Sequence, residues 1–230
     1  MFYYDSTYIL VIIGAILCMV ASSKVNSTFK KYSQIRSTSG ITGREAAERI
    51  LNHNGIYDVS IEHVPGDLTD HYDPRHKVLR LSDATYNSTS VAAIGVAAHE
   101  CGHALQHATD YSPLTIRGAL VPIANFGSQL AWPLIIIGIF LNGNTGMMII
   151  NAGIICFSVA VLFQLITLPV EFNASSRAVV QIGETGILGS DELPYTKKVL
   201  KAAAMTYVAS AAAGILQLLR LILIAKRNDD

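Results

Sequence analysis

Charged residues are scarce in this sequence. Asp, Glu, Lys and Arg make up 15% of its 230 residues, whereas 51% are hydrophobic. This composition excludes an ordinary soluble domain and favours a membrane protein with a modest polar part. The 17 basic and 17 acidic residues balance, and there is no basic run with interleaved aromatic residues. We therefore expect no nucleic-acid partner.

Cysteine is also rare, and its three positions do not suggest a disulfide framework. Cys18 and Cys156 lie in apolar stretches, whereas Cys101 lies in a predicted helix, two residues after His99. That spacing turns the Cys101 thiol away from the side of the helix that carries His99. We interpret Cys101 as a small packing residue.

Charge is almost absent from four long apolar stretches, at residues 8–21, 116–141, 147–168 and 202–225. Each is predicted to cross a membrane as a helix, and the middle two form a hairpin around a short uncharged turn at residues 142–146. Pro122 and Pro133 favour kinks in the second helix. The predicted fold class is a mainly α membrane protein with about four transmembrane helices and a small cytoplasmic α+β part.

The predicted domains follow the same pattern. Basic residues follow the first span but do not precede it, so the positive-inside rule places the N-terminus outside and the polar regions in the cytoplasm. Lys226 and Arg227 oppose this rule, so the topology of the last helix stays open. The domains are a first transmembrane helix (1–22), a cytoplasmic α+β region (23–112), a transmembrane hairpin (113–169), a cytoplasmic segment (170–201), a fourth transmembrane helix (202–225) and a tail (226–230).

The polar stretch at residues 37–82 predicts a helix followed by a small sheet. Thr42 and Glu45 have the spacing of a capping box, and Gly55 is a suitable residue to end the helix. Residues 57–64 and 77–81 are predicted strands. We expect a loop at residues 181–195, which are polar and contain two glycines and a proline.

The most informative pattern is His99-Glu100-Cys101-Gly102-His103, an H-E-x-x-H motif after an Ala- and Val-rich run that Ser88, Thr89 or Ser90 can cap. Helix residues four apart share one face, so His99 and His103 can bind one Zn²⁺ while Glu100 reaches a metal-bound water. The alternative is a buried helix with two hydrogen-bonded histidines. It would leave Glu100 buried at a cost.

A third ligand must come from elsewhere in the chain. His107 lies about 12 Å along the helix from His99, so the three histidines cannot share one zinc. Gln106 and Thr109 occupy the positions at which the metzincin pattern requires Gly and His. Glu171 is the better candidate, because it follows the third span and begins a run of small residues. The alternative is an exposed carboxylate at the membrane boundary.

At this point the chain resembles the YugP-like bacterial membrane zinc metallopeptidases. The resemblance rests on the H-E-x-x-H motif before a hairpin and on E-F-N-A-S-S-R-A from Glu171 onwards. It also includes residues 68–75 and 168–172. More distantly the chain is similar to the HtpX and CAAX-prenyl-protease gluzincins. The resemblance implies one Zn²⁺ per chain, His99, His103 and Glu171 as ligands, and Glu100 as catalytic base.

One position departs from the gluzincin pattern. Gluzincins commonly carry an Asp four residues after the ligand Glu, which orients a zinc-bound His. Ser175 stands at that position here. Ser175 or Asn173 is expected to replace the Asp as acceptor, or an acidic residue elsewhere does so.

The expected function is that of a zinc-dependent endopeptidase of the bacterial inner membrane, with its active site facing the cytoplasm. Its expected partners are protein or peptide substrates associated with the membrane, the lipid bilayer and, if access is regulated, another membrane protein. The strand at 77–81 could hold substrate by edge pairing, although a purely structural strand is an equal alternative. Candidate oxyanion donors are His71, Tyr72, Arg177 and Tyr207. Two other functions stay open: a scaffold with a structural metal, and a site-2-type intramembrane protease.

Overall fold

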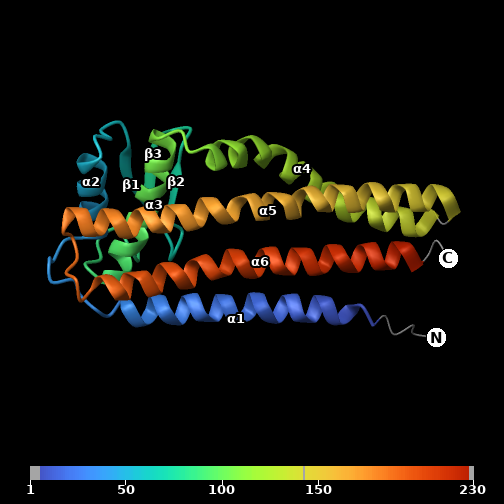
Figure 1. Ribbon diagram of the computed structural model, residues 1–230, viewed down its shortest axis with the longest axis horizontal. Helices are drawn as coiled ribbons and strands as arrows, with labels where there is room; N and C mark the ends of the chain where they lie inside the picture. Colours follow the sequence, from blue (N-terminus) through green and yellow to red (C-terminus); the bar gives the residue numbers. More distant parts are fainter. Residues whose placement is uncertain (1–5, 142, 228–230) are drawn as a thin grey trace. The chain divides into compact units, whose positions relative to one another are not determined.

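The computed structural model describes residues 6–141 and 143–227 as two compact units built mainly from helices (Figure 1). One unit contains residues 6–21, 116–141, 143–168 and 206–227, and the other contains residues 22–115 and 169–205. The helices are α1 (Tyr8–Tyr32), α2 (Gly43–His53), α3 (Val91–Ala108), α4 (Ser112–Leu141), α5 (Gly143–Thr185) and α6 (Leu193–Arg227). The strands are β1 (Ser60–Val64), β2 (His71–Asp73) and β3 (Val78–Ser82).

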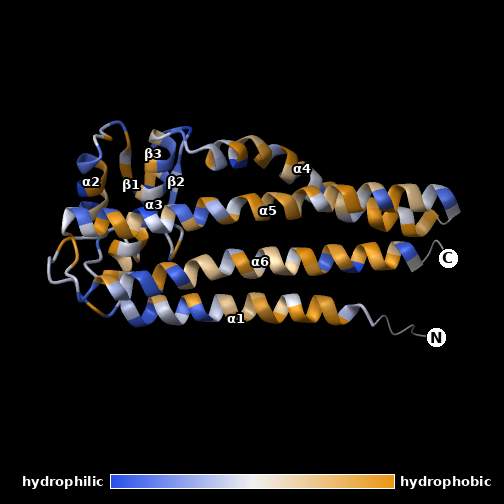
Figure 2. Ribbon diagram, viewed as in Figure 1, coloured by the Kyte–Doolittle hydropathy of each residue, from blue (hydrophilic) through white to orange (hydrophobic). Residues whose placement is uncertain are grey.

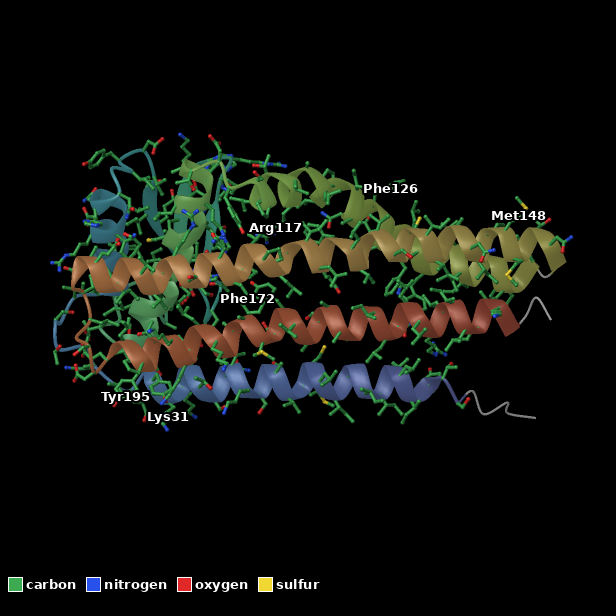
Figure 3. All side chains as sticks on the ribbon, viewed as in Figure 1. Lys31, Arg117, Phe126, Met148, Phe172 and Tyr195 are labelled. Atoms are coloured by element: carbon green, nitrogen blue, oxygen red, sulfur yellow. The ribbon has the colours of Figure 1, made fainter. Side chains whose placement is uncertain are left out.

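The first unit holds the membrane-spanning parts of α1, α4, α5 and α6. These four helices are long and apolar enough to cross a bilayer, as predicted. The helices of this unit carry mostly hydrophobic residues (Figure 2), and large side chains such as Phe126 and Met148 point outward from them (Figure 3). Lipid can cover such side chains, because the backbone of each helix satisfies its own hydrogen bonds. The chain is therefore a mainly α membrane protein.

All four long helices extend beyond the predicted spans, and α4 already begins at Ser112. α1 continues to Tyr32, α5 continues to Thr185, and α6 already begins at Leu193. The loop predicted at 181–195 is therefore wrong except at residues 186–192. Packing overrides the polar composition there, since Ile182 is fully buried and the Gln181 side chain accepts a hydrogen bond from Asn54. α5 already begins at Gly143, so residues 143–146 of the predicted turn are helical, and Asn142 lies outside the described residues.

The second unit begins with the predicted capping box. The Thr42 hydroxyl accepts from the Glu45 backbone N–H, and the Glu45 carboxylate accepts from the Thr42 backbone N–H, which caps α2. Gly55 follows the helix with a positive φ of 69°, a conformation that favours glycine. α2 buries Ala46, Ala47, Ile50 and Leu51 against the core.

The sheet has the order β1-β3-β2, with β1 parallel and β2 antiparallel to β3. β3 is therefore the central strand, and both of its edges are already paired. Of the two readings of residues 77–81, this excludes edge pairing with substrate and supports the purely structural strand. The first predicted strand begins only at Ser60, and the three-residue β2 is too short to have produced a recognisable pattern.

α3 lies at the centre of the second unit and buries most of its side chains. It contacts α2, β2 and β3, and it accepts a hydrogen bond from the α6 hydroxyl of Thr196 at the Val91 carbonyl (2.9 Å). Where α1 ends and α6 begins, Tyr32 and Tyr195 stack with ring centroids 5.4 Å apart, next to Lys31 (Figure 3). The H-E-x-x-H helix is thus held from several sides by protein.

Candidate metal centre

His99 and His103 lie on one face of α3. The helix begins at Ser90, whose hydroxyl accepts from the Ala93 backbone N–H at 3.1 Å, so Ser90 is the N-cap among the three candidates. Four residues make slightly more than one helical turn, which places the two imidazole rings with centroids 4.9 Å apart. The two histidine side chains are only 15% and 11% exposed.

Glu171 on α5 faces both imidazoles. Its Oε2 atom is 3.3 Å from His99 Nε2 and 3.6 Å from His103 Nε2, and its side chain is 3% exposed. One nitrogen of each histidine and one carboxylate oxygen lie within 4.8 Å of one another. Burial lowers the pKa of His103, but the Glu171 and Glu100 carboxylates outweigh burial, so the pKa is raised above its usual value.

The helices that carry the histidines and Glu171 approach closely because Gly102 has no side chain. A Cβ atom added at Gly102 would overlap the carbonyl oxygen of Ala174 on α5. Ala174 lies three residues after Glu171, so this contact sets how near the carboxylate comes to the histidines. The fourth residue of the motif therefore has a structural reason to be glycine.

Each histidine has an uncharged partner at its other ring nitrogen. Ser175 Oγ lies 3.1 Å from His99 Nδ1, so of the two candidates for the position of the usual Asp it is Ser175 that contacts His99. Gln106 Oε1 lies 3.0 Å from His103 Nδ1, a partner that the sequence analysis missed. The spacing of His103 and Gln106 could have indicated this contact, because residues three apart on a helix are neighbours.

Glu100 is only 8% exposed and follows His99 directly on α3. The thiol of the next residue, Cys101, points into the core and donates to the Ala47 carbonyl, which agrees with a packing role. Burial raises the pKa of Cys101, so the thiol stays neutral.

The structure does not bring every candidate residue to His99 and His103. His107 Nδ1 lies 2.8 Å from the Tyr72 hydroxyl, and burial together with the charges of Asp58 and Asp73 raises the pKa of Tyr72 to about 12. His71 is paired in register with Arg80 and lies on the opposite face of the sheet from Tyr72, because side chains alternate along a strand. Tyr207 belongs to the other unit.

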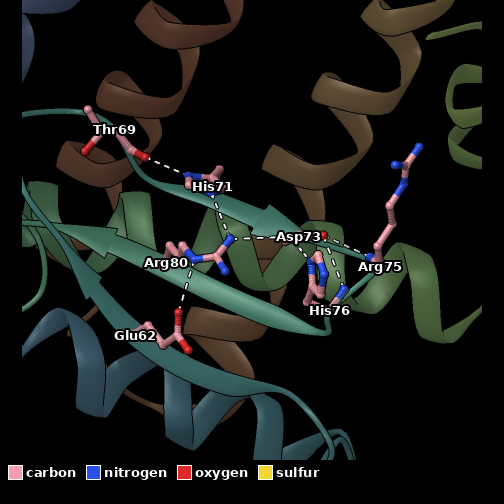
Figure 4. Close-up of polar contacts among 7 residues, drawn as sticks. All are labelled: Glu62, Thr69, His71, Asp73, Arg75, His76 and Arg80. Atoms are coloured by element: carbon pink, nitrogen blue, oxygen red, sulfur yellow. Dashed lines mark hydrogen bonds and ion pairs between the residues drawn. The ribbon is translucent and has the colours of Figure 1, made fainter. Parts of the chain in front are cut away.

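The exposed face of the sheet instead carries an ion-pair network (Figure 4). Arg80 donates to Glu62 and Asp73, and Asp73 also accepts from His76. The His76 hydrogen bond holds the pKa of Asp73 well below its usual value. His71 takes part through Arg80 and the Thr69 carbonyl. These contacts give His71 a role in the sheet.

Arg177 and Asn173 support the region next to the histidines. Arg177 Nε donates to Asn173 Oδ1 at 2.8 Å, and its guanidinium lies 5.7 Å from the centre of the Tyr111 ring. A further contact joins Arg177 to the Leu105 carbonyl at 3.5 Å. Both residues therefore contact neighbours of the histidines.

The donor set fits zinc. Two imidazole nitrogens and one carboxylate oxygen are a common ligand set of catalytic zinc, and they leave a coordination position for water. Within residues 6–141 and 143–227, His99, His103 and Glu171 are the single group of three metal-ligating side chains close enough to share an ion.

Comparison with known proteins gives two matches. Residues 7–226 match the family model described as "Putative neutral zinc metallopeptidase". The chain is also 50% identical over 210 residues to a Bacillus subtilis (strain 168) protein described as "Putative membrane protease YugP", covering 91% of this chain and 92% of that relative. No solved structure matched.

Proposed function

The chain belongs to the neutral zinc metallopeptidase family, and from this premise we propose that it is a membrane-embedded zinc endopeptidase with Glu100 as its general base. One observation carries the proposal. Two imidazoles from α3 and a carboxylate from α5 converge within 4.8 Å, and the carboxylate of Glu100 is next to them in the chain.

Different residues would bind the metal and transfer the proton. His99 Nε2, His103 Nε2 and Glu171 Oε2 would hold the zinc, which when bound supplies a water of lowered pKa and polarises the scissile carbonyl. The Glu100 carboxylate accepts a proton from the attacking water and later donates it to the leaving amine. Glu100 is only 8% exposed, so most of its surroundings are protein rather than bulk water.

We infer that the substrates are membrane-associated proteins and that the site faces the cytoplasm at the inner membrane. Glu171 follows the apolar part of α5 by only a few residues, so peptide segments near a bilayer are the natural targets. The basic residues of α1 and of the start of α6 support the cytoplasmic orientation.

The site-2-type alternative is less well supported. α3 is not among the four candidate membrane spans, and within the described residues it is surrounded by α2, the sheet, α5 and α6. A scaffold with a structural metal would have no use for the Glu100 carboxylate. Hydrolysis is therefore the function to test first.

The test is the Glu100→Gln variant of the purified full-length protein. The amide keeps the shape of the side chain but cannot accept the proton, so casein hydrolysis should fall at least about 100-fold while zinc content is unchanged. Glu184→Gln, an exposed acidic residue on α5, serves as the control and should cleave at the wild-type rate. Wild-type hydrolysis by Glu100→Gln would refute the proposed mechanism.

A further inference from the structure

Gln106 is a fully buried polar side chain that joins the two ligand-bearing helices. Its carbonyl oxygen lies 3.0 Å from His103 Nδ1 on its own helix. Its amide nitrogen donates to two acceptors on α5, the Val170 carbonyl at 2.8 Å and Asn173 Oδ1 at 3.0 Å. Val170 directly precedes Glu171. The Gln106 side chain therefore contacts one candidate ligand, His103, and the residue before another, Glu171.

The orientation of this amide follows from the chemistry of its partners. A backbone carbonyl only accepts, so the Val170 oxygen must face the Gln106 NH₂ group. The Arg177 guanidinium only donates, so the Asn173 atom that meets both Arg177 and Gln106 must be the oxygen. Both contacts require the NH₂ group of Gln106 to face α5. Its carbonyl oxygen is then left to face His103.

An amide oxygen only accepts, which decides the state of His103. The Nδ1 atom must carry the hydrogen, and in the neutral ring the lone pair is then on Nε2, the atom that faces Glu171. Ser175 cannot impose the same choice on His99, because a hydroxyl can either donate or accept.

We propose that Gln106 is a positioning residue of the site. Held by the Val170 carbonyl and by Asn173, whose oxygen also accepts from Arg177, it fixes His103 in the Nδ1–H tautomer and aims the Nε2 lone pair at the metal. The inference rests on the proposed function, since it takes His103 as a zinc ligand. The arrangement replaces the carboxylate that commonly orients a zinc-bound histidine with an uncharged amide.

The experiment compares two substitutions at Gln106 in the full-length protein. Gln106→Leu removes the acceptor and the donors, whereas Gln106→Glu keeps an acceptor for His103 Nδ1 but loses the donors to α5. Zinc affinity, measured by competition with a chelator, should fall about 10- to 100-fold in Gln106→Leu and recover most of this loss in Gln106→Glu. The melting temperatures of both zinc-free variants should fall by similar amounts, because both lose the donors to α5. A difference in zinc affinity between the two variants is then not a consequence of lower stability.

Thr196→Val is the matched control. It also removes a buried hydrogen bond to α3, but this bond is to the Val91 carbonyl at the start of the helix, far from His99 and His103. It should lower the melting temperature and leave zinc affinity unchanged. Wild-type affinity in Gln106→Leu, or equal losses in the Leu and Glu variants, would overturn the proposal. If Gln106→Leu does not fold, Asn173→Ala should still weaken zinc binding, though by less, because it removes only one of the two acceptors of the Gln106 NH₂ group. Wild-type zinc affinity in Asn173→Ala would then overturn the proposal.

A zinc measurement on His103→Ala separates this inference from the proposed function. Loss of zinc from His103→Ala together with full affinity in Gln106→Leu would refute the role of Gln106 and leave the metal site standing. Full zinc affinity in His103→Ala would remove the site itself, and the inference with it.

Discussion

Glu171 is the candidate ligand that comes from outside the motif, so its removal tests the site most directly. In Glu171→Ala the zinc affinity should fall more than about 100-fold. Loss of a metal ligand should weaken binding more than loss of a residue that hydrogen-bonds to a ligand, which typically costs about 10- to 100-fold. Zinc content and a chelator competition assay measure this. Glu184→Ala, on the same helix and exposed, is the control. Undiminished affinity in Glu171→Ala would show that another residue completes the site.

The raised pKa of His103 predicts how zinc binding depends on pH. In the zinc-free protein the Glu171 and Glu100 carboxylates favour the protonated ring, and zinc must displace that proton. Proton competition therefore begins at a higher pH than it would at an ordinary histidine of pKa about 6.5. Zinc affinity should rise from pH 6 to pH 8.

Stability of the zinc-free protein should change in the opposite direction. A group whose pKa is higher in the folded state stabilises the fold fully below its unfolded pKa, and this contribution is lost as pH rises through the folded pKa. The rise in melting temperature on adding zinc should therefore be larger at pH 8 than at pH 6. A constant rise across this range would contradict the ion pair between His103 and Glu171.

For single residues, the sequence predicts contacts between side chains that a fixed spacing on one helix brings together. His99 and His103 share a helix face because four residues nearly complete one turn. The role of Gln106 was not predictable in the same way. It depends on the Val170 carbonyl, which lies 64 residues further along the chain, and no local pattern marks which backbone atom will face a buried amide.

Among the elements, the pairing of α3 with α5 decides the geometry of the centre. In Gly102→Ala the new methyl group must push the Ala174 backbone away, so the carboxylate and the histidines separate. We expect a loss of about 1–3 kcal/mol in the free energy of unfolding and weaker zinc binding. Thermal unfolding and chelator competition on the same preparation check both.

Gly183→Ala is the control for this prediction. Gly183 also lies in α5, but a Cβ atom there would meet nothing within 4 Å. Alanine should stabilise that helix by roughly 0.5–1 kcal/mol and leave zinc affinity unchanged. If Gly102→Ala behaved like Gly183→Ala, the close approach of the two helices would not control the site.

The boundaries of the elements show where local pattern fails. The capping box at Thr42 and the N-cap at Ser90 were predictable because they act within three residues. The last turns of α5 were not predictable. Ile182 is buried by other elements, and the Gln181 amide oxygen accepts a hydrogen bond from Asn54, which is 127 residues away in the sequence. The middle position of β3 likewise depends on strand pairing rather than on composition.

Across the whole molecule, the apolar spans were predictable because a bilayer demands long uncharged helices, whatever the fold beside them. Charge is distributed just as unevenly. The described parts of α1 and α6 contain no acidic residue, and exposed lysines follow the first span and precede the last (Lys24, Lys30, Lys31, Lys197, Lys198 and Lys201). The positive-inside rule acts on such residues close to the ends of spans.

This asymmetry predicts which side of the membrane each region faces in intact cells. Asn144, at the exposed start of α5, should lie outside, and Asp67, in the exposed loop between β1 and β2, should lie in the cytoplasm. Single cysteines at these positions test this after Cys18 and Cys156 are replaced by alanine. Cys101 can stay, because its side chain is fully buried.

An impermeant maleimide should label Asn144→Cys and spare Asp67→Cys, which should become reactive once the cells are permeabilised. The parent protein without an introduced cysteine gives the background. Labelling of Asp67→Cys in intact cells, with Asn144→Cys protected, would place the H-E-x-x-H helix outside the cell. Because Glu171 and the motif must meet on one side to share a metal, that result would move the whole site and its substrates to the outer face, and the lysines flanking the spans would then contradict the positive-inside rule.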